Sequence, residues 1–126
     1  MSDREAAIVR VRDILLVTLP PDPDDSLISA FQDTVMDAFE RALAKALIFD
    51  LSAVEVFDSF FARTVSETAS MVALMGGRTS IAGMRPVVAI TVVQLGLPLS
   101  RVHRALTVDQ ALDRFLGAQE GGWQPS

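Results

Sequence analysis

The 126-residue chain contains no cysteine and no tyrosine, and it has one histidine, one lysine and one tryptophan. The absence of cysteine excludes disulfides, thiolate catalysis and cysteine-ligated zinc. A single histidine, His103, cannot by itself form a histidine metal site or a proton relay. No apolar run reaches the length of about 18 residues that a membrane-spanning helix needs. The charged N-terminus leads into no apolar signal region, so we expect a cytoplasmic protein that does not bind membranes.

The residues that are present are mostly aliphatic, and acidic residues outnumber basic ones. Hydrophobic residues make up 50% of the chain and aromatic residues 6%, while the net charge is −5. A chain of this length fits one domain that buries a core of its own. The acidic balance argues against nucleic acid as a partner.

Apolar periodicity and turn residues divide the chain into alternating strands and helices. A hairpin turn at Arg12-Asp13 joins the first two strands, and the second strand is apolar enough to be buried on both faces. Strands are predicted over 8–11, 14–19, 47–50, 78–82 and 101–105. Helices are predicted from 24–26 through Lys45, from Ser59 to Gly76-Gly77, from Pro86 to Gln94 or Leu95, and from a capping box at 107–110 to Gly117.

This order predicts an α/β fold in a single domain over residues 1–117. The sheet is mixed but mostly parallel, with four helices and an antiparallel first strand. Residues 118–126 form a flexible C-terminal tail, in which Trp123 could fold back or meet a neighbour. The inner stripe of the first helix is predicted to reach Leu43 and Ala46, and that of the second helix to end at Met75.

In such sheets, ligands and partners usually bind at the carboxyl ends of the strands. In this chain the predicted carboxyl ends carry Asp50, the Asp58-Ser59 pair and Gly83. Asp50 invites comparison with a phospho-accepting receiver domain, but the required acidic pair and late lysine are missing. We interpret Asp50 as a loop carboxylate that accepts hydrogen bonds from nearby amides. No phosphate-binding loop or nucleophile motif occurs, so we expect no enzyme activity, no cofactor and no metal. His103, between two arginines, is predicted to lie on the surface.

Ser59 has two compatible interpretations. It is a favoured residue type for a helix N-cap. It is also a hydroxyl that a kinase could phosphorylate, with the helix N-terminus tolerating the new charge and Asp58 opposing it. Helical spacing places Phe60 on a flank with Arg63, Thr64 and Glu67, about a quarter-turn from the inner stripe. Phe60 therefore either covers the edge of the core or faces a partner.

Three segments together resemble a known family. They are the strand, loop and helix start at 48–60, which includes Asp50-Leu51 and Asp58-Ser59-Phe60; the helix end Leu74-Met75-Gly76 before a strand; and the helix from Pro86 to Gly96. The chain resembles the STAS domains, and among them the RsbS-type scaffolds of stressosomes.

The resemblance implies a scaffold that binds a serine/threonine switch kinase of the RsbT type and releases it when Ser59 is phosphorylated. It also implies RsbR-type STAS paralogues as partners and self-association into dimers and a large assembly. We assign Asp58, Phe60 and Arg63, which flank Ser59, to the kinase-binding surface. The alternative is a free anti-sigma factor antagonist that binds an anti-sigma kinase when dephosphorylated. Such antagonists usually read D-S-S-G where this chain has Asp58-Ser59-Phe60-Phe61, which favours the scaffold.

Overall fold

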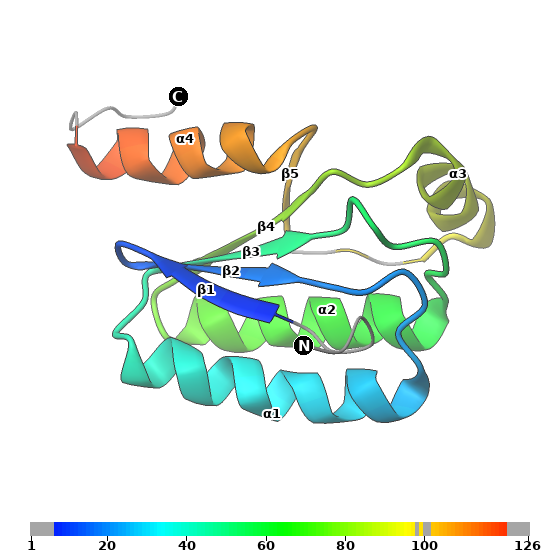
Figure 1. The fold of residues 1–126 in the computed structure, drawn as a ribbon, viewed down its shortest axis with the longest axis horizontal. Helices are drawn as coiled ribbons and strands as arrows, with labels where there is room; N and C mark the ends of the chain where they lie inside the picture. The colour runs from blue at the N-terminus through cyan, green and yellow to red at the C-terminus, as the bar shows by residue number, and fades with distance from the viewer. Residues whose placement is uncertain (1–6, 98, 100–101, 121–126) are drawn as a thin grey trace.

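The structure is a computed structural model that describes residues 7–97, 99 and 102–120. Over these residues the strands and helices alternate in the predicted order (Figure 1). The strands are β1 (Ala7–Val11), β2 (Ile14–Thr18), β3 (Ala46–Asp50), β4 (Arg78–Ala82) and β5 (His103–Ala105). The helices are α1 (Asp25–Arg41), α2 (Ser59–Leu74), α3 (Pro86–Leu95) and α4 (Val108–Glu120).

The five strands form one sheet in the order β1-β2-β3-β4-β5. β1 pairs with β2 antiparallel through the tight turn at Arg12-Asp13, and the remaining pairs are parallel. The predicted mixed sheet with an antiparallel first strand is confirmed. Figure 1 shows α1 and α2 on one face of the sheet, α4 on the other, and α3 at the end where the parallel strands finish.

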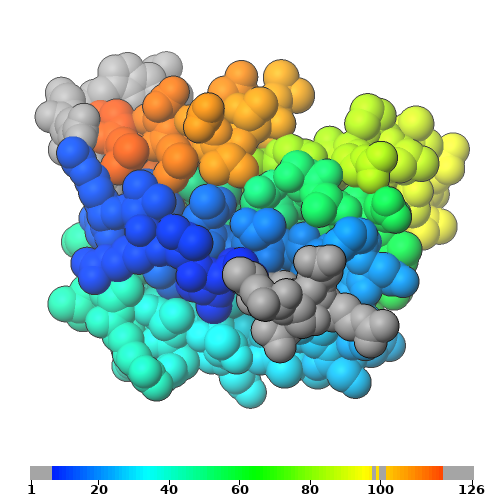
Figure 2. Space-filling view, viewed as in Figure 1, coloured from blue at the N-terminus to red at the C-terminus, as the bar shows by residue number. Residues whose placement is uncertain are grey.

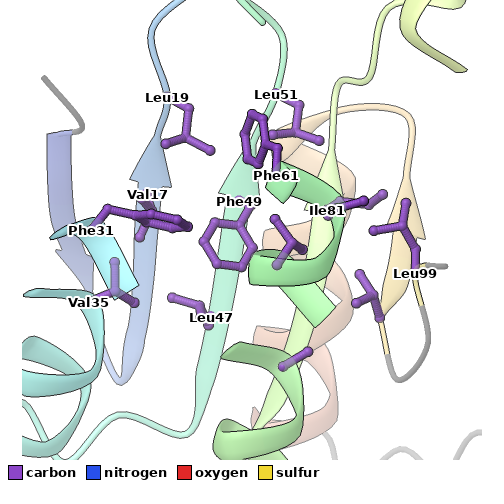
Figure 3. Packing of buried hydrophobic residues seen from close by; sticks show 14 of the residues in the cluster. Val17, Leu19, Phe31, Val35, Leu47, Phe49, Leu51, Phe61, Ile81 and Leu99 are labelled. Atoms are coloured by element: carbon purple, nitrogen blue, oxygen red, sulfur yellow. The ribbon is translucent and has the colours of Figure 1, made fainter. Parts of the chain in front are cut away.

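The sheet separates a large core from a small one. In β3, Leu47 and Phe49 face α1 and α2, whereas Ala46 and Ile48 face α4. This is why the strand reads as a continuous apolar run, because both of its faces are covered. Figure 3 shows the large core, where side chains from the sheet meet those of α1 and α2.

Helix α1 ends at Arg41, four residues earlier than predicted, so Lys45 lies in the connection to β3. Leu43 has a left-handed φ of 52° and is 80% exposed, which corrects its placement on the inner stripe. The Leu43 N–H donates to Glu40 O and the Ala44 N–H to Phe39 O, both at 3.1 Å. These two hydrogen bonds form a Schellman motif, which normally has glycine at the left-handed position. Because leucine occupies that position here, the sequence pattern did not indicate the helix end.

Helix α2 ends at Leu74, and Gly76 follows it with a φ of 85°. Met75, predicted on the inner stripe, is half exposed because it forms the C-cap and has left the helical face. Gly77 packs closely, since a Cβ there would lie 2.8 Å from both Phe39 Cζ and Val72 Cγ1. The glycine pair therefore both turns the chain and allows α2 to approach the sheet.

The last helix begins as predicted and ends later. Thr107 Oγ1 accepts from the Gln110 N–H, and Gln110 Oε1 accepts from the Leu106 N–H, both at 3.1 Å. Gly117 does not stop the helix, which continues to Glu120, so the tail predicted from residue 118 begins within α4. Trp123 lies outside the described residues, as does Arg101, the predicted start of β5.

Candidate functional site

The connection between β3 and α2 combines buried anchors with an exposed outer surface. Leu51, Val54 and Phe57 point into the large core, and the Phe57 ring lies 4.5 Å from that of Phe61. The Leu51 N–H donates to Ala82 O at 2.9 Å, which ties the loop to β4. These anchors hold the following Asp58-Ser59 pair at the carboxyl end of the sheet.

Asp50 has the role predicted for a loop carboxylate. Its Oδ1 accepts from the Ser52 N–H at 3.0 Å and from the Ser52 hydroxyl at 2.7 Å. Next to this turn, Gly83 has a φ of 74°, and a Cβ there would lie 3.0 Å from Ser52 Cβ. Asp50 thus stabilises a closely packed turn at the start of the loop that connects β3 to α2.

Asp58, not Ser59, is the N-cap of α2. Its backbone is extended, and its Oδ1 accepts from the Phe61 N–H at 2.9 Å. The N-cap interpretation of Ser59 is therefore wrong by one position. Aspartate and serine are about equally favoured as caps, so the pair Asp-Ser could not be ordered from sequence alone.

Ser59 occupies the first helical position of α2, and its side chain is exposed. Within the described residues its hydroxyl has no hydrogen-bond partner, and the N–H groups of Ser59 and Phe60 have no acceptor. Arg63 is exposed one turn later, at the i+4 spacing that brings two side chains together on a helix. Arg63 forms no ion pair with a carboxylate of the described residues.

The flank that carries Phe60 is divided between surface and core. Arg63 is exposed, as predicted, but Thr64 is buried against α1. Gln32 Nε2 of α1 donates to Thr68 Oγ1 at 3.1 Å and approaches Thr64 O at 3.5 Å, a polar contact that the apolar pattern did not predict. Phe60 is half-buried and packs against the large core, so it covers the core edge and also shows part of its ring to solvent.

His103 is not a free surface residue, which corrects its predicted place. It is half-buried, and its ring lies 6.4 Å from that of Phe115 in an edge-to-face arrangement. Burial lowers the pKa of His103 below 6.5, and the charges of Arg114 and Arg78 lower it further. The His103 ring therefore packs against the edge of the small core through Phe115, and this environment favours the neutral imidazole.

The described residues meet the requirements of neither a metal-ligand cluster nor a membrane-spanning helix. No three histidine, aspartate or glutamate side chains among them gather closely enough to hold a metal ion. No helix in this part of the chain is both long and apolar enough to cross a membrane.

Comparison with known proteins identifies a domain family that matches most of this chain. Residues 5–111 match the profile of the STAS domain. Two curated relatives from Bacillus subtilis are the RsbT co-antagonist proteins RsbRB, 30% identical over 78% of this chain, and RsbRA, 26% identical over 67%. The chain spans only about a third of the length of these relatives, covering 35% and 31% of them.

Solved structures give matches over almost the whole chain. A serine-to-glutamate variant of RsbS from Moorella thermoacetica is 28% identical, with a TM-score of 0.78 over 90% of this chain and 97% of that one. A chain from a stressosome structure is also 28% identical, with a TM-score of 0.73 over 90% of this chain and 99% of that one. From its profile match and these structures, the chain belongs to the STAS domain family.

Proposed function

We propose that this chain is a non-enzymatic scaffold of the stressosome type that binds an RsbT-like serine/threonine kinase and releases it when Ser59 is phosphorylated. The observation that carries the proposal is the exposed Ser59 hydroxyl at the first position of α2, in a STAS domain similar to RsbS. The names of the curated relatives, co-antagonists of RsbT, support a kinase of that type as the partner. Asp58, Phe60 and Arg63 form the kinase-binding surface around the serine.

The start of α2 has the groups needed to accommodate a phosphate. A phosphoserine carries close to two negative charges and several strong acceptor oxygens. The unpaired N–H groups of Ser59 and Phe60 and the helix dipole stabilise an anion at this position. Because these N–H groups and the helix dipole stabilise the phosphate, phosphorylation changes the charge of the surface without unfolding α2.

The same phosphate also alters what a kinase would contact. Arg63 lies at i+4 from Ser59 and is unpaired within the described residues, so the phosphate draws its guanidinium into an internal ion pair. A kinase that used Arg63 as a hydrogen-bond donor loses it and meets two added charges beside Asp58. Both effects weaken the complex.

The modification site is tested by incubating the protein with a cognate RsbT-type kinase and ATP. Mass spectrometry should place the phosphate on Ser59, and Ser59→Ala should abolish incorporation. Ser52→Ala is the control, because Ser52 is the other exposed serine of this loop and its hydroxyl is bonded to Asp50. Phosphate found chiefly on Ser52, or unchanged incorporation in Ser59→Ala, contradicts the assignment.

The switch itself is tested by calorimetric titration of the kinase. Ser59→Asp should weaken binding by about tenfold or more, and the phosphoprotein should bind still more weakly. Ser26→Asp is the matched control, since Ser26 is an exposed serine in the first turn of α1 and acquires the same charge. Equal affinities for wild type, Ser59→Asp and the phosphoprotein would remove the electrostatic switch.

Assembly separates the scaffold from a free antagonist. The stressosome match and the RsbR-type relatives support pairing with STAS paralogues and self-association. Light scattering with and without an RsbR-type paralogue should show a very large particle only in the mixture. A monomer or dimer under both conditions would favour the free anti-sigma factor antagonist.

A further inference from the structure

A cavity of about 490 Å³ lies between α3 and the edge strand β5, at the carboxyl ends of β4 and β5. Its apolar wall includes Ile81 of β4, Met84 after that strand, Val92 of α3, and Leu97 and Leu99 beyond it. Figure 3 shows Ile81 and Leu99 beside one another at this end of the core. The volume is within the range of small-molecule sites, and the carboxyl ends of parallel strands are where such sites occur.

Helix α3 is apolar on every side, although the fold buries only Val88 of it. Figure 2 shows the helix, in yellow-green, at the right-hand end of the molecule. Ala89 and Val92 face the cavity, and Val93, also at its rim, is 79% exposed. A helix with this composition is normally covered on most sides. Here its apolar surface at the cavity has no covering partner among residues 7–97, 99 and 102–120.

Among the residues that the structure describes, one charged side chain lines the cavity. Arg104 of β5 is exposed, and its guanidinium approaches Leu99 O at 3.4 Å, which is a long and weak hydrogen bond. No carboxylate of the described residues pairs with it. The guanidinium therefore keeps donors available for an anionic group at the mouth of an otherwise apolar space.

We propose that this cavity binds a small amphiphilic carboxylate. The alkyl body packs against Ile81, Met84 and Val92, and the carboxylate pairs with Arg104. A single guanidinium beside apolar side chains suits one anionic head and a hydrocarbon tail, whereas a nucleotide would need several polar groups to read its base and phosphates. The proposal is independent of the phosphorylation of Ser59.

The test uses hexanoate, octanoate and decanoate below their micelle concentrations, followed by methyl NMR of the full chain. Signals of Ile81, Met84 and Val92 should shift, and affinity should rise by up to about fourfold for each added methylene. Decanol is the uncharged reference ligand, because it offers the same tail without a carboxylate.

Two variants, with a third as control, separate the contribution of the ligand's carboxylate from that of its hydrocarbon tail. Arg104→Gln should weaken decanoate about tenfold while leaving decanol unchanged, because only the charge-assisted bond is lost. Arg41→Gln, on the exposed side of α1, should change neither. Ala89→Phe fills the cavity and should abolish binding of both ligands.

Three results would overturn the proposal. The first is the absence of shifts at the cavity methyls at any ligand concentration. The second is an equal loss of decanoate and decanol affinity in Arg104→Gln. The third is a set of shifts confined to Val87 and Ile90, which are exposed and do not line the cavity, or shifts that depend on protein concentration without ligand. Either pattern would make α3 a contact surface for another protein or a second copy.

Discussion

Asp58 caps α2, and we propose that its charge also contributes to the kinase-binding surface; substitution can separate these two contributions. Its Oδ1 accepts from the Phe61 N–H at 2.9 Å, which caps the helix. Its charge also lies next to Ser59, on the surface that we assign to the kinase. Asp58→Ala removes both the cap and the charge, whereas Asp58→Asn keeps a side-chain acceptor and removes only the charge.

The cost of each change follows from the contacts. Loss of an N-cap acceptor destabilises a protein by about 1 kcal/mol, and up to about 2 kcal/mol. Loss of the charge alone removes its interaction with the helix dipole, worth roughly 0.3–1 kcal/mol at an exposed site. Phe61 and Val65, in the first two turns, belong to the large core, so the loss should appear in global unfolding. We expect Asp58→Ala to lower the melting temperature by roughly 3–6 °C, and Asp58→Asn by less.

Urea unfolding followed by circular dichroism measures the stability, with an unchanged slope showing that the transition is the same. Asp24 supplies a matched control, because it caps α1 through an Oδ1 bond of 2.8 Å to the Leu27 N–H. Asp24→Ala should lower stability by a similar amount and leave kinase affinity unchanged. If Asp58→Ala is as stable as wild type, or Asp58→Asn loses as much as Asp58→Ala, the capping argument fails.

Further predictions concern packing and pH. Gly77→Ala should cost about 1–3 kcal/mol of unfolding free energy, because its Cβ would overlap Phe39 and Val72. Gly117→Ala, inside α4 with open space around its Cβ, should instead raise the unfolding free energy by up to about 1 kcal/mol. Urea unfolding of both variants checks the pair, and a loss in Gly117→Ala or none in Gly77→Ala contradicts it. His103 has its pKa lowered by burial and by nearby arginines, so the neutral form is favoured in the folded state. Stability that is present above pH 6.5 should therefore fall as the pH drops below 6.5, and His103→Gln should lack this part of the pH dependence. An equal acid-induced loss in the variant and wild type would refute it.

The fold was predictable because several local signals agreed. The apolar run in β3, the proline at the start of α3 and the glycine after it all indicated the structure that is observed. The errors fell at helix ends, where other residues replaced the expected signals. Leu43 takes a left-handed conformation without being glycine, and Gly117 continues a helix that glycine usually ends. At both places the observed backbone departs from the residue's usual preference.

The candidate site was only partly predictable. Sequence indicated Ser59 and the start of α2, but assigning the cap required knowing that Asp58 turns its side chain back onto the Phe61 amide. Helical spacing placed Thr64 on the polar flank of α2, but the residue is buried. Its hydroxyl donates to Phe60 O within the same helix, so it can be buried without an unsatisfied donor. The partner across the interface, Gln32 of α1, comes from a segment distant in sequence, so no local pattern could have shown the contact.

Helix α3 shows where a pattern predicts structure but not function. Its residues predicted a helix and both of its ends, yet an apolar surface on every side gives no direction for packing. The structure supplies that direction by placing β5 beside it and Arg104 at the rim of the space between them. The charged residue and the apolar helix are separated in sequence, and only the parallel pairing of β4 with β5 brings them together. A ligand site of this kind therefore arises from the topology of the sheet.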